Sequence, residues 1–229
     1  MKYAPSALIG RLSRSAGSTT ASHNRFGAYL RNRVIPTNPQ SAAQLLIRGR
    51  LSTWSDNWRS LTAEQRAAWT ALGLQMIRTD SLGETYSLTG LQAYISVNQN
   101  LSNTGSSNLT DAPALSIPAS LLSLTLSIDN EGTATLAYTA TPLATGVKAM
   151  IFASPPVSPG INFMAASRFK LLQVTAAAAA SPATITSAYI AKFGTPPTGD
   201  KVFARVILVN ASGFAAPPFT TSSIVVAAP

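Results

Sequence analysis

Cysteine is absent from the sequence, and histidine occurs once, as His23. Neither a disulfide framework nor a thiolate metal site can therefore form, and one imidazole cannot make a His-based metal site. Ser-His-Asp and Cys-His catalysis both lack a base, because His23 lies in a basic segment away from any carboxylate. These absences favour a non-enzymatic protein with no metal and no cofactor.

Charge is scarce as well. Charged residues make up 11% of the chain, whereas soluble domains usually carry roughly 25%. The hydrophobic share of 46% is ordinary for a folded protein, so uncharged polar residues and alanine must cover the surface. A subunit packed among neighbours needs less surface charge than a freely diffusing enzyme, so this composition favours a component of an assembly.

Acidic residues are missing from the N-terminal part in particular, where the first carboxylate is Asp56. The formal net charge is +9, and the first 50 residues hold eight basic side chains: Lys2, Arg11, Arg14, Arg25, Arg31, Arg33, Arg48 and Arg50. Such a segment suggests a polyanion or an acidic protein groove as its partner, and arginine suits planar contacts with phosphate or carboxylate.

Long hydrophobic runs are absent too. No run is long enough to cross a membrane, and the one before Arg11 is too short for the core of a signal peptide. We therefore expect a soluble protein that is made inside the cell and has no membrane partner.

Three patterns invite a catalytic or binding interpretation, but each has a simpler one. Asp80 with Glu84, and Asp129 with Glu131, flank turns, so we interpret them as solvated turn residues rather than an acid/base pair or a cation site. The stretch "GTPPTGDK" (residues 194–201) has the glycine spacing of a phosphate-binding loop. Its lysine comes one residue late and its prolines remove N–H donors, so we predict a turn there.

Residues 1–36 show no sustained hydrophobic period, and we predict an extended basic arm that is ordered by what it touches. Apolar side chains between the arginines give the arm something to bury, which argues against a tail that never orders. The residues that we expect to contact a partner are Arg11, Arg14, Arg25, Phe26, Tyr29, Leu30, Arg31 and Arg33.

Residues 37–101 predict a module of three helices. We expect the first to begin at Thr37 or Asn38, with Pro39 in its first turn. The patterns "SLTAEQ" (residues 60–65) and "SLTGLQ" (residues 87–92) each predict a capping box that opens a further helix, with a turn or short hairpin at Gly83 between them. The expected core consists of Ile47, Leu51, Trp54, Trp58, Trp69 and Leu72.

The polar stretch 102–114 predicts a linker. Beyond it the hydrophobic period changes from helical to two, as in "LSLTLSI" (residues 122–128). Six or so strand-like runs separated by Pro/Gly loops predict an antiparallel β-sandwich over residues 115–229. "KVFARVILVN" (residues 201–210) has the pattern of a central strand, and "TSAYIAKFG" (residues 186–194) suggests a short helix. The predicted fold class is therefore α+β multidomain.

The residues 25–101 carry the spacings Gly-x-Tyr-x-Arg, Asn-Pro-x-x-x-x-Gln and Trp-x-x-Leu-Thr-x-x-Gln-Arg-x-x-Trp, then a Gly-containing helix that ends in Asn. This pattern resembles an uncharacterised family of tailed bacteriophages and prophages, which implies a phage structural role. Its fixed positions here are Gly27, Tyr29, Arg31, Asn38, Pro39, Gln44, Trp58, Leu61, Thr62, Gln65, Arg66, Trp69, Gly90 and Asn100. More loosely, "KVFARVILVNASGFAAPPFT" (residues 201–220) is similar to the last two strands of fibronectin type III and other Ig-like domains, which implies a fold but no ligand.

Together these observations favour a non-enzymatic virion structural protein, with a head-associated minor capsid or decoration protein preferred over a tail component. The basic arm and the helices would dock on other virion proteins (major capsid, portal/neck or tail subunits), within a homo-oligomer assembled in the bacterial cytoplasm, and the sandwich would project outward. The alternatives are a nucleic-acid-binding virion protein that uses the arginine-rich arm, a tail or neck component, and an adhesin or carbohydrate-binding module. The predicted sandwich loops hold few of the aromatic side chains that sugar stacking requires.

Overall fold

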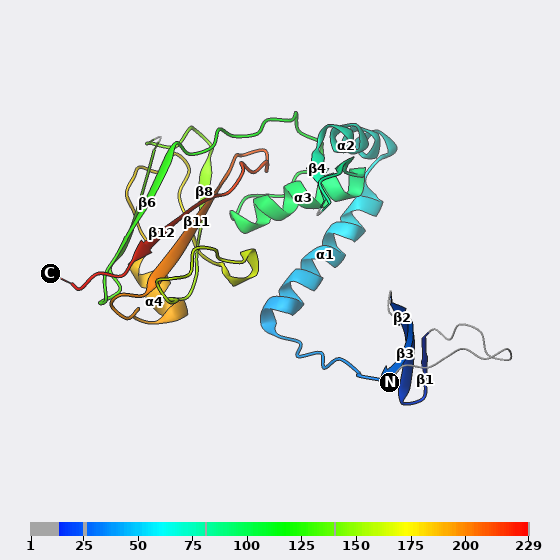
Figure 1. Ribbon diagram of the computed structural model, residues 1–229. Helices are drawn as coiled ribbons and strands as arrows, with labels where there is room; N and C mark the ends of the chain where they lie inside the picture. The colour runs from blue at the N-terminus through cyan, green and yellow to red at the C-terminus, as the bar shows by residue number, and fades with distance from the viewer. Residues whose placement is uncertain (1–13, 25–26, 81, 140, 229) are drawn as a thin grey trace. The chain divides into compact units, whose positions relative to one another are not determined.

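A computed structural model describes residues 14–24, 27–80, 82–139 and 141–228 (Figure 1). The chain divides into two compact units, Met1–Gly49 and Arg50–Pro229. Helices and antiparallel sheets occur together, so the fold class is mixed α+β, as predicted.

The first unit contains a three-stranded antiparallel sheet where an extended arm was predicted. Its strands, with the second in the middle, are β1 (Arg14–Ala16), β2 (Thr19–Asn24) and β3 (Gly27–Asn32). Gly17 adopts a φ of +58° in the two-residue turn that it forms with Ser18, a conformation that a side chain disfavours. A Gly-Ser pair between strand-like runs is a hairpin signal, and overlooking it led to the prediction of an irregular arm. Arg11, Arg25 and Phe26 lie outside the described residues.

Helix α1 spans Ala42–Ser60 and begins later than predicted. The backbone of Gln40 has a φ of +46°, which interrupts any helix that starts at Asn38. The side chain of Asn38 accepts a hydrogen bond from Arg48 Nη1 at 3.3 Å instead. Ser41 Oγ accepts one from Gln44 N at 3.4 Å and so caps the helix. The expected cap at residues 37–38 was therefore wrong, although Ser-x-x-Gln is itself a capping-box pattern.

The other two helices of the module begin at the capping boxes that the sequence predicts. They are α2 (Ala63–Gln75) and α3 (Gly90–Asn103). Gln65 N donates to Thr62 Oγ1 at 3.2 Å while Thr62 N donates to Gln65 Oε1 at 3.0 Å, and Thr89 with Gln92 repeats both bonds. Between the two helices, β4 (Ile77–Thr79) pairs with β5 (Thr85–Ser87) in the expected short hairpin around Gly83.

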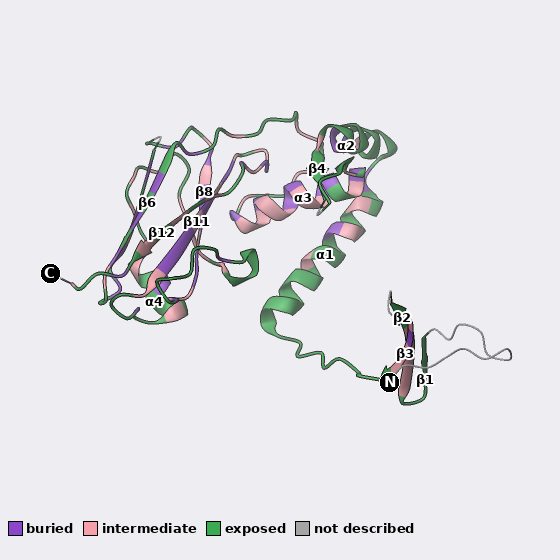
Figure 2. Cartoon of the chain, viewed as in Figure 1, coloured by how far each residue is buried: buried purple, intermediate pink, exposed green. Residues whose placement is uncertain are grey.

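Aromatic packing holds the helical module together, and the buried positions of α3 are visible in Figure 2. Trp54, Trp69 and Leu72 are buried, and Trp58 packs against them while partly exposed. The ring of Trp69 meets Tyr94 edge-on, with the two centroids 5.2 Å apart. The tryptophans and Leu72 were correctly predicted to belong to this core, whereas Tyr94 was not predicted in it.

Ile47 and Leu51 were predicted in the same core but are exposed, with 47% and 48% of their surface accessible. Their spacing does align them with Trp54 along the helix. Helical periodicity shows which residues share a face, but it does not show how far along the helix a packing partner extends.

The stretch predicted as a linker is fastened to the helices. Its first two residues belong to α3. Further along the stretch, the backbone of Leu109 is bound by Asn98, a fully buried side chain of α3. Asn98 Nδ2 donates to the Leu109 carbonyl at 3.2 Å, and Leu109 N donates to Asn98 Oδ1 at 2.7 Å. Trp69 Nε1 donates to the carbonyl of Thr110 at 2.8 Å. Residues 102–114 are therefore part of the packed structure.

Two antiparallel sheets follow, with strand orders β10-β7-β6 and β12-β11-β8-β9. The strands are β6 (Ser123–Ile128), β7 (Ala134–Thr139), β8 (Lys148–Ala153), β9 (Lys170–Val174), β10 (Ala183–Thr184), β11 (Lys201–Val209) and β12 (Phe219–Ile224). The alternation predicted over residues 122–128 is confirmed within β6, where Leu124, Leu126 and Ile128 are buried and the residues between them are exposed. Leu122, just before the strand, was expected on the same buried face but is 78% exposed. β11 lies between two neighbours, as expected of a central strand, and buried side chains of both sheets form one cluster.

Two shorter predictions in this region are also confirmed. A short helix, α4 (Thr186–Phe193), follows β10 and buries Tyr189. Residues 194–201 form turns, in which Gly194 ends α4 and Asp200 N donates to the carbonyl of Pro197 at 3.3 Å, just before β11 begins at Lys201.

The helices and the sheets of the second unit share contacts at the turn between β11 and β12. Phe214 from this turn is buried in the aromatic core of the helices. At this turn, Asn100 Nδ2 donates to the carbonyl of Gly213 at 2.9 Å. A further contact comes from β8, where Lys148 Nζ donates to the carbonyl of Thr104 at 2.9 Å. The expected helical module and β region are thus packed together.

Candidate functional site

The acid pairs that could carry chemistry are turn residues, as predicted. Asp80 Oδ1 accepts hydrogen bonds from the N–H groups of Leu82 and Glu84, at 2.8 and 2.9 Å. Asp129 Oδ1 likewise accepts from two N–H groups of its own turn, one of them that of Glu131. In the described part of the chain, no three acidic or histidine side chains gather as metal ligands would. These carboxylates shape hairpins.

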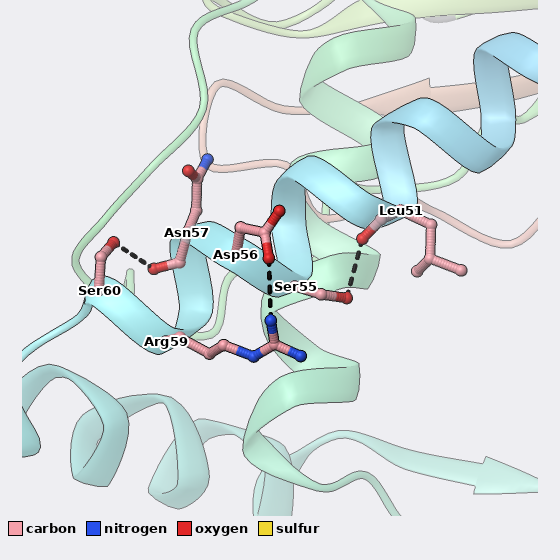
Figure 3. A network of polar contacts seen from close by, with 6 residues as sticks. All are labelled: Leu51, Ser55, Asp56, Asn57, Arg59 and Ser60. Carbon is pink, nitrogen blue, oxygen red and sulfur yellow. Dashed lines mark hydrogen bonds and ion pairs between the residues drawn. The ribbon is translucent and has the colours of Figure 1, made fainter.

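Asp56, the first carboxylate of the chain, is paired within its own helix (Figure 3). Its Oδ1 accepts a hydrogen bond from Arg59 Nη1 at 3.0 Å, and both side chains are mostly exposed. The hydroxyls of Ser55 and Ser60 donate to carbonyls of the same helix. An exposed ion pair contributes roughly 0–1 kcal/mol, and every partner lies on α1. This network therefore serves the helix rather than a ligand.

The arginines of the first unit have no acidic partner in their own unit, because residues 1–49 contain no Asp or Glu. Arg14, Arg31 and Arg33 are all exposed. Arg31 lies opposite Thr20 in the sheet, and Thr20 lies opposite Ser15 with their hydroxyl oxygens 2.7 Å apart. Cross-strand partners share a face, so a guanidinium and two hydroxyls lie together on one side of the sheet.

The two apolar anchors expected in the arm lie on different faces of this sheet. Side chains alternate along a strand, so Tyr29 shares the face of Arg31, whereas Leu30 shares the opposite face with its cross-strand neighbour Ala21. Both anchors are partly buried. His23, on β2, is exposed. The sheet therefore separates residues that the arm hypothesis had grouped against one partner.

Every residue from 31 to 49 is exposed (Figure 2). Five of them are large and apolar, with exposed fractions of 81% for Val34, 77% for Ile35, 51% for Leu45, 52% for Leu46 and 47% for Ile47. Uncovered apolar surface of this extent is typical of a site that a partner covers. We call residues 33–48 the exposed segment. One sequence signal does point to it, since three consecutive apolar residues at 45–47 cannot all face one side of a helix.

Within the described ranges, the titratable groups whose pKa is clearly shifted are buried tyrosines. Burial, and to a smaller extent the charge of Asp200, raises the pKa of Tyr189 above its usual value of 10.0. The Tyr189 hydroxyl has no hydrogen-bond partner among the described residues. Burial also raises the pKa of Tyr138, whose hydroxyl donates to two backbone carbonyls. These groups belong to the core.

None of the helices in the described ranges is long and apolar enough to cross a membrane. No model of a known protein family matches this sequence, and a search of curated proteins finds no significant match.

Proposed function

We propose that this chain is a non-enzymatic structural protein of a tailed-bacteriophage virion, a head-associated minor capsid or decoration protein, and that the exposed segment attaches it to a neighbouring subunit. The observation that carries the docking role is the set of large apolar side chains left uncovered in residues 33–48. The resemblance of residues 25–101 to a phage family supports the virion as the place of assembly.

The chemistry of the exposed segment defines the surface that would receive it. Burying a valine, leucine or isoleucine side chain contributes about 1.5–3 kcal/mol, so the five exposed side chains supply a large driving force for association. Arg31, Arg33 and Arg48 lie beside them and have no acid in their own unit. The receiving surface therefore combines an apolar groove with carboxylates, which pair with guanidinium groups.

We infer that residues 115–229 form an Ig-like β-sandwich that projects from the attachment point. Two antiparallel sheets that share one hydrophobic cluster support this inference. The pairing of β11 with β12 around the turn at Gly213 agrees with the loose similarity to the last strands of fibronectin type III domains.

Incorporation into particles tests the docking role. We expect the triple variant Leu45→Ser, Leu46→Ser and Ile47→Ser to fold, because all three side chains are exposed, but to be largely lost from purified virions. The matched control replaces Leu74, Leu122 and Phe163 by serine, since these side chains are at least as exposed and lie outside the segment. The measurement is the amount of the chain in purified particles relative to its amount in the producing cells.

Equal incorporation of the triple variant and its control would refute docking through the exposed segment. Deletion of residues 1–36 provides a second readout, because it removes Val34, Ile35 and all but one of the unit's basic side chains. Normal incorporation of that shortened chain would likewise contradict the proposal.

Nucleic-acid binding is the second candidate, and one observation favours it. Arg31 lies in a cross-strand row with the hydroxyls of Thr20 and Ser15, a group of donors that suits a phosphate. If this face binds duplex DNA, the logarithm of the association constant must fall as the logarithm of the salt concentration rises, by about 0.9 per neutralised phosphate. Fluorescence anisotropy at several salt concentrations measures this slope. If the chain does not bind duplex DNA at low salt, nucleic-acid binding is rejected and docking on a protein is the remaining candidate.

A further inference from the structure

A pocket of about 270 Å³ lies in the second unit, where the hairpin β4–β5 meets α3 and the turn between β11 and β12. Its walls include Ile77 and Arg78 of β4, Asn100 of α3, Ile117 and Phe214. Small-molecule and cofactor sites usually span about 300–1,000 Å³. The pocket is therefore slightly smaller than most such sites, and it has room for an inserted side chain.

Hydrogen bonds hold the walls of this pocket in place. Asn210 Nδ2 donates to the carbonyl of Ser116, and Asn210 Oδ1 accepts from Phe214 N at 2.9 Å. Asn100 Nδ2 donates to the carbonyl of Gly213 at 2.9 Å. Gly213 has a φ of +80°, and a Cβ there would lie 2.7 Å from the carbonyl oxygen of a residue on α3. The pocket is preformed, so an occupant need not order it.

The lining of the pocket specifies an apolar and acidic occupant. Ile77 and Ile117 on its walls are 66% and 62% exposed. Arg78 is the one charged residue of the lining, and it has no ion-pair partner among the described residues. An apolar side chain beside a carboxylate would cover the isoleucines and neutralise the guanidinium.

The turn of the same hairpin presents that chemistry. Leu82 has 86% of its surface exposed, more than any other large apolar residue in the described ranges. Glu84, two residues further on, is exposed, and its carboxylate has no partner among the described residues. The carboxylate of Asp80, by contrast, is occupied by the N–H groups of the turn. Leu82 therefore matches the apolar walls of the pocket, and Glu84 matches the charge of Arg78.

We propose that the pocket receives the β4–β5 turn of a second copy of this chain, with Leu82 inserted and Glu84 against Arg78. Each copy supplies both a pocket and a turn, so in a two-fold symmetric dimer the contact of one turn with the partner's pocket is repeated in reverse. The contact is made twice in the dimer, so its contribution to the free energy of dimerisation is doubled. It is independent of the exposed segment and goes beyond attachment to a neighbouring virion protein.

Charge exchange tests this pairing in the full-length chain by sedimentation equilibrium. Arg78→Glu sets two carboxylates against each other, and Glu84→Arg sets two guanidinium groups against each other, so we expect each to raise the dimer Kd by about tenfold or more. The double variant R78E/E84R restores opposite charges and should recover most of the affinity. Leu82→Ser should weaken the dimer as well, whereas Leu74→Ser, on α2 and also exposed, should not.

Three results would overturn the proposal. One is a wild-type chain that stays monomeric up to about 1 mM, because at that concentration even a dimer with a binding free energy of about −4 kcal/mol would be detected. Another is a double variant as weak as its two parents. The third is a loss of dimer affinity in Lys170→Glu equal to that in Arg78→Glu, because Lys170 is an exposed position on β9, outside the pocket. The serine triple variant of residues 45–47 should dimerise normally, so failure of the docking role and failure of the dimer are told apart.

Discussion

Replacing Asn98 by alanine tests whether residues 104–111 belong to the folded unit or merely connect its parts. Asn98 is fully buried and makes two hydrogen bonds to the backbone of Leu109, at 3.2 and 2.7 Å. Each bond has a net value of about 0.5–1.5 kcal/mol, and partner groups left unsatisfied cost about 1–3 kcal/mol. We expect the free energy of unfolding to fall by about 3 kcal/mol. For a unit of this size, that lowers Tm by about 6–12 °C.

Thermal unfolding followed by circular dichroism measures this loss, and thermolysin digestion at the native temperature shows where it acts. We expect new cleavage near Leu109, because the freed segment reaches the protease. Asn108→Ala is the control, since Asn108 is exposed and its side chain accepts one bond from Ser102. Surface changes of that kind stay within about 0.5 kcal/mol. If Asn98→Ala melts and digests like the control, the two hydrogen bonds do not fix the segment.

Three further predictions concern single side chains. Thr89→Ala removes the capping box of α3 and should cost about 1 kcal/mol, whereas Thr89→Ser should retain most of it in the same thermal melt. Leu51→Ala should change the free energy of unfolding in urea by less than about 0.5 kcal/mol, but Trp54→Ala by about 3–5 kcal/mol; similar losses would contradict the packing. Tyr189→Phe removes a buried hydroxyl that has no partner among the described residues, so stability at neutral pH should stay equal or rise. Because folding raises the pKa of Tyr189, the contribution of its protonated hydroxyl to the free energy of unfolding is fully present below pH 10.0 and is lost as the pH rises towards the folded pKa. In alkaline urea titrations, the free energy of unfolding of Tyr189→Phe should therefore fall less than that of the wild-type chain.

Local signals predicted local structure well. The Ser-Leu-Thr-x-x-Gln patterns specify both caps, because donor and acceptor lie three residues apart and need no distant partner. The alternation in β6 likewise reports a sheet with one buried face. The tryptophans of the core were identified by helical spacing and large apolar area.

Predictions that depended on distant partners fared less well. The exposure of Ile47 and Leu51 depends on where the neighbouring helices end, which spacing does not reveal. The role of Asn98 depends on a backbone eleven residues away, and a polar side chain on a helix gives no sign of that. The exposed segment overlaps the predicted arm only at its start, because three of its five large apolar residues, at positions 45–47, lie beyond residue 36.

Phe214 belongs by sequence to the β region, but it fills a position in the aromatic core of the helices. This limits how the protein can exchange parts in evolution. A recombination event at residues 102–114 would leave the helices without their phenylalanine, unless the incoming domain brought an equivalent hairpin. Exchange before Arg50 removes no residue from that core. Relatives with a different first unit on the same second unit are therefore easier to produce than relatives with the same helices on a different β domain.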